Sequence, residues 1–286
     1  MNALAMPKWK RSTESSRRSA SRRQAQQNLL DIVRAIQTER AIERAREEEA
    51  KKGELSFRTF VEMAWPIMEP GTRFVPNWHI DAICDHLAAA SRGDITRLIV
   101  NVPPGLMKSL LVSVFWHAWE WGPLNMPHLR FLATSYSEDF TKRDTRKTRD
   151  LLRSEWYQRL WGRRVQLTRV GERSFENTAR GVRDTRPFRS LTGGRGDRLL
   201  IDDPHSTETA ESDAERERTL RIFRESVPLR INDQEKSVIA IIMQRLHQND
   251  VTGEALRLDL GYTHLRLPMR FEADNPSKTF VHGKLF

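Results

Sequence analysis

The stretch RLIVNVPPGLMKSLLVSVFWHAW, which runs from Arg97 to Trp119, decides the fold of this 286-residue sequence. Residues 97–102 are typical of a buried strand that ends at a Pro-Pro-Gly turn, and Lys108 and Ser109 then open a strongly apolar helix. A Lys-Ser pair at such a junction is typical of a P-loop. There the ammonium group reaches the β- and γ-phosphates of a nucleotide, the hydroxyl group goes to Mg²⁺, and free helix N–H groups face the anion. The pattern therefore predicts a nucleotide-binding loop formed by Pro104, Gly105, Leu106, Met107, Lys108 and Ser109.

Two positions depart from the usual pattern G-x-x-x-x-G-K-[ST]. Val102 and Met107 stand where glycines are expected, although glycine normally lets the backbone approach a phosphate closely. Gly105 and the fixed φ angles of the two prolines are another possible source of the loop geometry. Taken alone, the motif is equally compatible with an incidental turn between a strand and a helix.

Composition and charge restrict the class of protein. The formal net charge of +10 and the pI near 10.1 favour a polyanionic partner such as nucleic acid, although a basic protein without such a partner is the alternative. No apolar run approaches the roughly 20 residues that span a bilayer, so we expect no membrane partner. The single cysteine, Cys84, excludes an internal disulfide and a zinc site built on several cysteines.

The order of apolar segments predicts an α/β fold. Residues 1–54 form a basic, charged arm that we expect to be disordered or helical, and that is either a docking arm or a tail without a role. From residue 55 to 270, strands alternate with helices, which predicts one domain with a mostly parallel sheet and helices on both faces. Strands are expected at 97–102, 128–135, 197–204, 237–244 and 264–271, helices at 109–121, 138–154, 208–226 and 250–259, and one or two short hairpin strands within 164–188.

An acidic pair follows the apolar residues 199–201. Asp202 and Asp203 lie where NTP hydrolases carry acidic residues beside their P-loop. The first carboxylate would bind Mg²⁺, and the second would orient and polarise the attacking water. An Asp-Asp-Pro turn without a catalytic role is the alternative, because both residue types favour turns. The Lys108 loop upstream favours the nucleotide interpretation.

Two further loops carry candidate residues. Gln244 stands at the tip of a very apolar strand, where a polar side chain can sense the γ-phosphate, and Arg245 lies beside it. A plain loop with Asn249 as the N-cap of the next helix is compatible with that role. The Gly-rich segment 192–198 would supply an arginine finger to a neighbouring subunit, bind DNA phosphate, or serve only as a connection.

Together these segments resemble the ATPase half of the large terminase subunit of tailed bacteriophages and prophages, the motors that drive DNA into empty capsids. The resemblance runs from about Phe57 to Asp274 and rests on NVPPGLMKS, SLTGGRGDRLLIDDPH and IIMQRLHQNDVTGEAL, in that order. The segment FVPNWHIDAICDHL is similar to the helix on the adenine side of that family, which implies that Trp78 and His79 lie near the base.

The resemblance implies a P-loop ATPase of the additional-strand (ASCE) type, with ATP and Mg²⁺ as cofactors. It implies that Lys108 binds phosphate, that Ser109 and Asp202 bind Mg²⁺, and that Asp203 takes the place of the catalytic glutamate. Gln244 and Arg245 match the motif that couples hydrolysis to movement. Many members carry an arginine where this chain has a glycine in the P-loop, so the charge-stabilising arginine would come from elsewhere. The candidates are Arg195, Arg198 and Arg230.

The same resemblance implies a motor subunit that translocates viral double-stranded DNA of any sequence into the procapsid, in the host cytoplasm at the procapsid portal. The implied partners are DNA, the portal protein, the small terminase subunit and further copies of the chain in a homo-oligomeric ring. Large terminases usually carry a C-terminal nuclease domain. We expect residues 271–286 to begin a linker toward this absent domain, and we expect no nuclease activity. The competing interpretations are a catalytically silent P-loop module that acts as a DNA or portal adaptor, and a helicase-like ATPase, which would need a second nucleotide-gripping domain.

Overall fold

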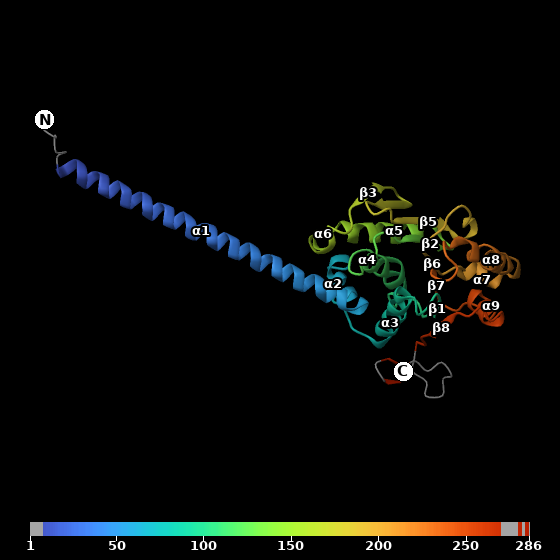
Figure 1. The fold of residues 1–286 in the computed structure, drawn as a ribbon. Helices are drawn as coiled ribbons and strands as arrows, with labels where there is room; N and C mark the ends of the chain where they lie inside the picture. Colours follow the sequence, from blue (N-terminus) through green and yellow to red (C-terminus); the bar gives the residue numbers. More distant parts are fainter. Residues whose placement is uncertain (1–7, 270–279, 282–283, 286) are drawn as a thin grey trace. The chain divides into compact units, whose positions relative to one another are not determined.

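The chain divides into two units, residues 1–49 and 50–286. The computed structural model describes residues 8–269, 280–281 and 284–285 (Figure 1). Within the first unit, the described residues belong to one long helix, α1 (Lys8–Leu55), whose last turn is part of the second unit. The start of the expected arm, and most of the linker expected at 271–286, lie outside the described residues.

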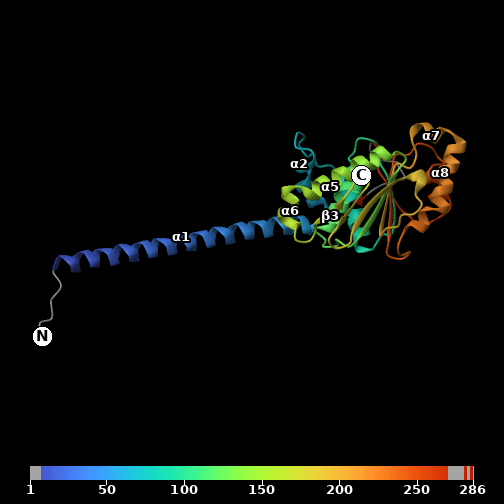
Figure 2. The same cartoon turned by 90° about the horizontal axis from the view of Figure 1, so that it is seen from above.

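The second unit is built on an eight-stranded sheet in which β1, β2, β5, β6, β7 and β8 run parallel, while β3 and β4 form an antiparallel hairpin at one edge (Figures 1 and 2). Strand β7 lies between β1, which leads into the Lys108 loop, and β6, which ends in the acidic pair. This is the additional strand that defines the expected P-loop class. In sheet order the strands are β3 (Leu167–Val170), β4 (Ser174–Asn177), β5 (Val182–Pro187), β2 (Arg130–Ser135), β6 (Arg198–Asp202), β7 (Val238–Met243), β1 (Arg97–Asn101) and β8 (Thr263–Arg266).

Successive side chains of a strand point to opposite faces of the sheet, and those of the central strands are apolar on both faces. Helices therefore cover both faces. In β1, for example, Leu98 and Val100 belong to one hydrophobic core and Ile99 to the other. The first core holds α2 (Phe57–Met68), α3 (Trp78–Arg92), the π-helix η1 (Leu110–Phe115), α4 (Trp116–Trp121), α5 (Glu138–Arg153) and α6 (Glu155–Trp161). The second holds the short helices η2 (Phe188–Ser190) and η3 (Val227–Arg230), together with α8 (Asp213–Glu225) and α9 (Val251–Arg257).

The mixed α/β fold with a mostly parallel sheet is therefore as the sequence predicted, and the differences are local. The segment 164–188 contains three strands instead of one or two, because its outer strand is exposed and polar and shows no clear alternation. The helix expected at 208–226 is divided into α7 (Thr207–Glu211) and α8, since the Ser212 hydroxyl caps α8 by accepting from Glu215 N–H. Two further short strands, β9 (Phe280–Val281) and β10 (Lys284–Leu285), pair with each other.

The helix expected at 109–121 starts with α-helical residues at Lys108 and Ser109, but it continues as the π-helix η1 and returns to α-helix only at Trp116. The Ser113 carbonyl accepts bonds from two side chains, Thr148 Oγ1 at 3.2 Å and Arg183 Nη1 at 2.8 Å. These bonds satisfy a carbonyl in the irregular turn, which helps to keep the wider helix. Such outside contacts cannot be read from the local sequence.

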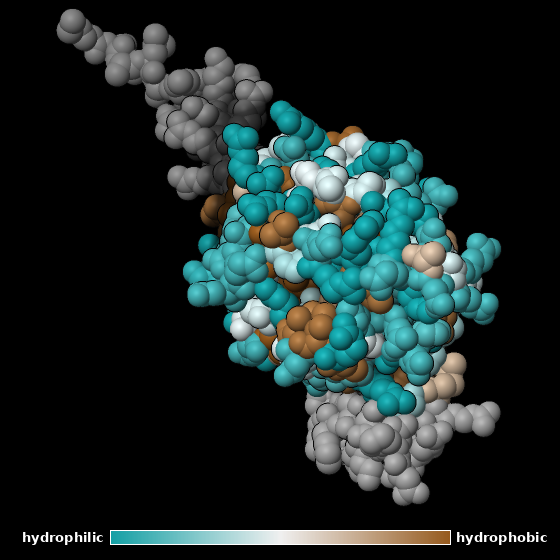
Figure 3. All heavy atoms as spheres, turned by 90° about the vertical axis from the view of Figure 1, so that its right-hand side faces the viewer, coloured by the Kyte–Doolittle hydropathy of each residue, from teal (hydrophilic) through white to brown (hydrophobic). Residues whose placement is uncertain are grey.

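The surface is predominantly polar. The face in Figure 3, which carries α8 and α9, is mostly hydrophilic, with hydrophobic side chains that stand singly or in small groups. No helix in the described part of the chain is both long and apolar enough to cross a membrane.

Candidate nucleotide-binding site

Most of the residues that the sequence singled out for catalysis meet at one edge of the sheet. Because β1, β6 and β7 run parallel, their carboxyl ends lie together, with Asn101 opposite Met243 and Asp202 opposite Ile242. The P-loop, the acidic pair and the Gln244 loop each begin where one of these strands ends. In open α/β sheets, this edge is where ligands bind.

The P-loop obtains its shape from two residues with left-handed backbone conformations. Gly105 has φ of 82° and Met107 has φ of 59°. A side chain at Gly105 would meet no atom within 4 Å, so its backbone angle, and not space, requires glycine there. Met107 adopts a conformation that costs a side-chain-bearing residue about 1–2 kcal/mol. Met107, which stands where P-loops usually have glycine, therefore strains the backbone of this loop.

Val102, by contrast, needs no glycine. Its N–H group donates to the Met243 carbonyl at 3.2 Å and thus continues the ladder between β1 and β7 by one residue. The first departure from the usual P-loop pattern is therefore accommodated by a longer strand.

Lys108 is buried and forms an ion pair with Asp203. Asp203 is itself in a left-handed conformation, with φ of 41°, and its second carboxylate oxygen, Oδ1, accepts from Gln244 N–H at 3.1 Å. Its main chain donates to the Ile242 carbonyl at 2.9 Å. Backbone strain of this kind persists where neighbouring structure enforces it, and it is common at functional sites. One carboxylate thus joins the P-loop lysine to the start of the Gln244 loop.

Asp202 is buried, and its Oδ1 atom has no hydrogen-bond partner in the described part of the chain. The pKa of this carboxyl group is raised to about 7, first by burial and then by the charge of Asp203, against the opposite effects of Lys108 and the Ser109 side chain. A buried carboxylate oxygen without a partner, close to a serine hydroxyl, fits a hard cation that prefers oxygen ligands.

Ser109 and Asp202 are therefore the residues that would hold Mg²⁺. The described residues contain no group of three or more His, Cys, Asp or Glu side chains suited to a metal. A site with one carboxylate and one hydroxyl matches the habit of Mg²⁺, which commonly completes its shell with water and substrate phosphates.

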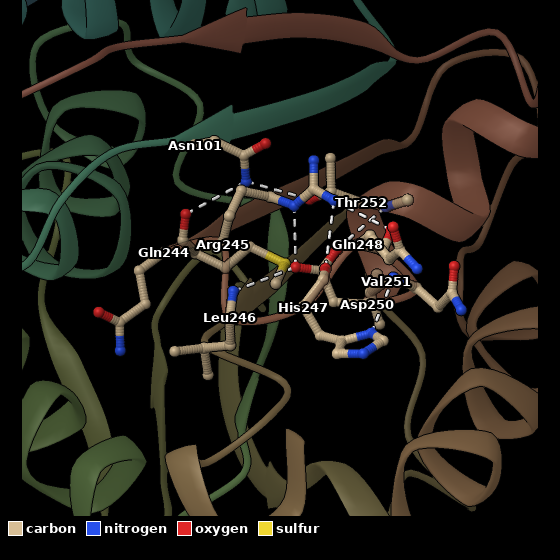
Figure 4. A network of polar contacts seen from close by, with 12 residues as sticks. Asn101, Gln244, Arg245, Leu246, His247, Gln248, Asp250, Val251 and Thr252 are labelled. Carbon is tan, nitrogen blue, oxygen red and sulfur yellow. Dashed lines mark hydrogen bonds and ion pairs between the residues drawn. The ribbon is translucent and has the colours of Figure 1, made fainter. Parts of the chain in front are cut away.

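The Gln244 loop is held together by internal polar contacts (Figure 4). Arg245 Nε donates to Asp250 Oδ2 at 2.9 Å, and Arg245 Nη2 donates to the carbonyls of His247 and Gln248. The Gln244 side chain points away from this network. Arg245 therefore stabilises the loop to which it belongs, whereas the Gln244 side chain takes no part in these contacts.

The N-cap of α9 is Asp250 and not Asn249, so this detail of the prediction is wrong. Asp250 is fully buried, and its Oδ1 accepts from Gly253 N–H at 3.0 Å. A carboxylate that also pairs with Arg245 makes the stronger cap.

Two residues to which the sequence analysis gave no role connect these parts. Asn101, the last residue of β1, donates from Nδ2 to Met243 O at 3.2 Å and to Thr252 Oγ1 at 3.0 Å (Figure 4). Its Oδ1 accepts from His264 Nε2 at 2.7 Å. One buried amide thus joins β1, β7, β8 and α9. The only signal in the sequence was a polar residue at the end of an apolar strand.

His205 is the second such residue. Its ring is buried, and Nε2 accepts from Val251 N–H at 3.2 Å, at the first turn of α9. Burial lowers the pKa of His205 to about 4, so the imidazole is neutral near pH 7 and can act as an acceptor.

Trp78 and His79, expected near the adenine base, occupy the first turn of α3. Helix α3 packs on β1 and η1, which flank the P-loop. The two rings meet edge to face with centroids 6.4 Å apart, and burial lowers the pKa of His79, against a smaller opposite effect of Asp81. Their role toward the base stays a prediction.

The arginine candidates lie elsewhere. Arg198 is the first residue of β6 and is therefore at the amino end of the strand, whereas Asp202 is at the carboxyl end. It is buried, and its Nη2 and Nε donate to the fully buried Glu120 carboxylate at 2.8–3.0 Å. Arg198 as an arginine finger is therefore wrong, because its guanidinium is consumed by a structural ion pair.

Arg195 and Arg230 share the same end of β6, where Gly196 N–H donates to the Arg230 carbonyl at 3.0 Å. Arg195 is exposed, and its Nε donates to Leu229 O at 3.1 Å. Arg230 is half-buried. The P-loop follows the carboxyl end of β1, whereas these two arginines lie at the amino end of β6. They would therefore serve only the site of another subunit.

Comparisons with known proteins give no sequence relative: no protein-family model and no curated protein matches this chain. Among solved structures, the chain is similar to the large terminase of bacteriophage HK97, with a TM-score of 0.49 and 11 % identity over 78 % of this chain and 46 % of that one. A mutant ATPase domain of the large terminase of Thermus phage P74-26 has a TM-score of 0.40 and 12 % identity, over 63 % and 68 % of the two chains.

A third similar structure is the large terminase from a thermophilic bacteriophage in complex with ATP-gamma-S, with a TM-score of 0.39 and 10 % identity, over 64 % of this chain and 44 % of that one. All three are large terminases, the family that the sequence motifs resemble. The chain spans less than half the length of the first and the third of these proteins.

Proposed function

We propose that this chain is a Mg²⁺-dependent ATPase and the motor part of a machine that drives double-stranded viral DNA into a procapsid. The observation that carries the proposal is the meeting of Lys108, Ser109, Asp202 and Asp203 at one sheet edge, with β7 inserted between the P-loop strand and the acidic strand. The motifs that resemble large terminases narrow the ATPase to DNA packaging.

The geometry suggests how the site would work. The phosphates of an incoming ATP would take the place of Asp203 beside the Lys108 ammonium group, since both are anions that a buried lysine can pair with. Asp203 would then be free to accept a proton from water as the water oxygen attacks the γ-phosphorus and the bond to the β-phosphate oxygen breaks. Mg²⁺, held by Ser109 and Asp202, would neutralise charge on the phosphates.

Movement would begin at the Gln244 loop. The Gln244 N–H group is bound to the same Asp203 carboxylate that pairs with Lys108, so release of that carboxylate changes the anchoring of the loop. The loop is rigid internally through Arg245 and Asp250 and would therefore shift as one body.

The proposed partners follow from charge and from the motifs. The net charge of +10 suits contacts with DNA phosphates of any sequence. The portal protein, the small terminase subunit, a homo-oligomeric ring and a location at the procapsid portal in the host cytoplasm are part of the same proposal. Binding of the protein releases counterions from the DNA phosphates, and this release is less favourable at high salt. DNA binding should therefore weaken steeply as the salt concentration rises.

Phosphate release with ATP and Mg²⁺, with and without DNA, tests the proposal in the wild type and in Lys108→Ala. The expected result is hydrolysis by the wild type and almost none by the variant. Lys236→Ala, an exposed lysine, is the matched control and should keep the wild-type rate. Equal phosphate release by wild type and Lys108→Ala would refute the ATPase.

A second function, a P-loop module that binds DNA or portal but does not hydrolyse ATP, is favoured by one observation: the strained Met107 where P-loops carry glycine. Binding of a fluorescent ATP analogue without phosphate release under any DNA condition would select this function over the motor.

A further inference from the structure

Helices η1 and α5 run side by side away from the nucleotide edge, because each follows the carboxyl end of a parallel strand. Their relative register is fixed by Thr148 Oγ1, which donates to the Ser113 carbonyl at 3.2 Å. About one helical turn before Thr148 and Ser113 stand Asp144 in α5 and Ser109, which directly precedes η1. Because both helices rise from the same edge, Asp144 and its neighbour Arg143 lie at about the level of the Ser109 hydroxyl.

Arg143 is held at this level by its own neighbour. Its Nε donates to Asp144 Oδ1 at 2.9 Å and its Nη2 to Asp144 Oδ2 at 3.3 Å. The Asp144 side chain is 6 % exposed and the Arg143 side chain 43 % exposed. The guanidinium also lies over the Phe140 ring, with Cζ 5.0 Å from the centroid. A buried carboxylate and an aromatic face thus orient an otherwise accessible cation.

The fork has a free side. Only Nε and Nη2 are used by Asp144, and among the described residues nothing accepts a hydrogen bond from Arg143 Nη1. A guanidinium fixed through one side and open on the other is suited to a planar or tetrahedral oxyanion, and little side-chain entropy remains to be lost on binding.

Electrostatics connect this arginine to the site. The pKa of Arg143 is raised, chiefly by its hydrogen bond to Asp144 and in part by the charges of Asp144 and Asp202. The Asp144 charge in turn contributes to the raised pKa of Asp202. The two groups therefore lie within electrostatic reach of the carboxylate assigned to Mg²⁺.

Other arginines are less suitable. Arg245 is bound to Asp250 inside its own loop, Arg198 is bound to Glu120, and Arg195 and Arg230 lie at the opposite edge of the sheet. The P-loop itself carries Gly105 and no arginine.

We propose that Arg143 is a phosphate-binding catalytic residue of its own chain's nucleotide site, where it contacts the γ-phosphate and stabilises the charge that develops on it during hydrolysis. This inference rests on the proposed ATPase function. In this chain, an arginine of α5 would stabilise the charge on the γ-phosphate, because the P-loop has no arginine to do so.

The test compares Arg143→Ala, Arg143→Lys and Arg153→Ala in the full chain. Arg143→Lys keeps a positive charge beside Asp144 and thus the local fold, but it loses the fork. We expect both Arg143 variants to lower ATP turnover by about 10³-fold and to weaken ATP-gamma-S binding, with ADP affinity unchanged. Arg153→Ala, exposed at the far end of the same helix, should behave as the wild type.

Wild-type turnover in Arg143→Lys would overturn the catalytic assignment and leave the ATPase proposal intact. It would mean that Arg143 only neutralises the charge of Asp144, which a lysine can also do. An equal loss of ADP and ATP-gamma-S affinity would overturn the γ-phosphate contact. An inactive wild type would overturn the ATPase and this inference together.

Mixing separates action within a chain from action between chains. Lys108→Ala subunits retain Arg143, so they would rescue Arg143→Lys subunits if this arginine served a neighbour. We expect no rescue at any mixing ratio, and recovered hydrolysis would overturn the assignment to the same chain.

Discussion

Lys108 and Asp203 form an ion pair although they are 95 residues apart in sequence. The two side chains on which phosphate binding and water activation would depend therefore satisfy each other in the structure. This pairing offsets the cost of burying a lysine at the P-loop. In the proposed mechanism, each of the two would act only after the other has changed partner.

The first prediction concerns Asp203→Asn. We expect phosphate release to fall by about 10²- to 10⁴-fold, because the amide cannot accept the proton of the attacking water. ATP binding should be retained or tightened, since Lys108 no longer has a competing carboxylate. Steady-state hydrolysis and ATP-gamma-S titration measure the two effects. Asp139→Asn, an exposed acid at the start of α5, is the control, and unchanged hydrolysis in Asp203→Asn would remove Asp203 from the mechanism.

The second prediction is a pH dependence of stability due to His205. The pKa of the folded state is lowered to about 4, below the ordinary 6.5, so the unfolded chain takes up the proton first on acidification. The stabilising contribution is complete above pH 6.5 and is lost as pH falls toward 4, by up to about 3 kcal/mol.

Urea unfolding at pH 7.5 and 4.5 checks this contribution. His205→Gln keeps an acceptor for Val251 N–H but does not titrate, so it should lose less stability between the two pH values than the wild type. His128→Gln, at an exposed position, should follow the wild type. Equal pH dependence in all three proteins would show that His205 does not titrate in this range.

The third prediction concerns the strained P-loop. Met107→Gly should raise the free energy of unfolding by about 1 kcal/mol, because glycine adopts φ of 59° without steric cost. Gly105→Ala should lower it by a similar amount, about 1 kcal/mol, since φ is 82° and no contact compensates. Thermal or urea denaturation measures both, and a destabilised Met107→Gly would mean that Met107 packing outweighs its backbone strain.

The fourth prediction tests the reassignment of Arg198. Arg198→Met should destabilise the fold by about 3–5 kcal/mol, because Glu120 is left as a fully buried charge. The double variant Arg198→Met/Glu120→Leu should recover most of this loss. Arg195→Ala should leave stability unchanged, as its side chain is exposed. Additive losses in the double variant would contradict a coupled pair.

Much of the fold was predictable because its signals are local. The strands β1, β6 and β7 are nearly continuous apolar runs, as buried parallel strands are, and each ends in polar residues. Since parallel strands share a carboxyl edge, the meeting of Lys108 with Asp202 and Asp203 followed from their positions after strands.

The remainder depends on partners distant in sequence. Arg198 reads as part of a Gly-rich surface turn until its partner Glu120, in α4, is known. The buried roles of Asn101 and His205 likewise depend on His264 and Val251. The cap of α9 was misplaced by one residue because Asn249 and Asp250 have similar capping preferences, and only the pairing with Arg245 favours the second.

The π-helix after the P-loop has a consequence for comparing this chain with others. A π-helical turn contains about one residue more than an α-helical turn, so η1 behaves as an α-helix with an inserted residue. When this sequence is aligned with P-loop proteins whose corresponding helix is α throughout, the gap belongs within 110–115. An alignment that keeps the helix ungapped would shift Trp116 and every residue up to Trp121 by one position, and it would match buried aromatic side chains with the wrong counterparts.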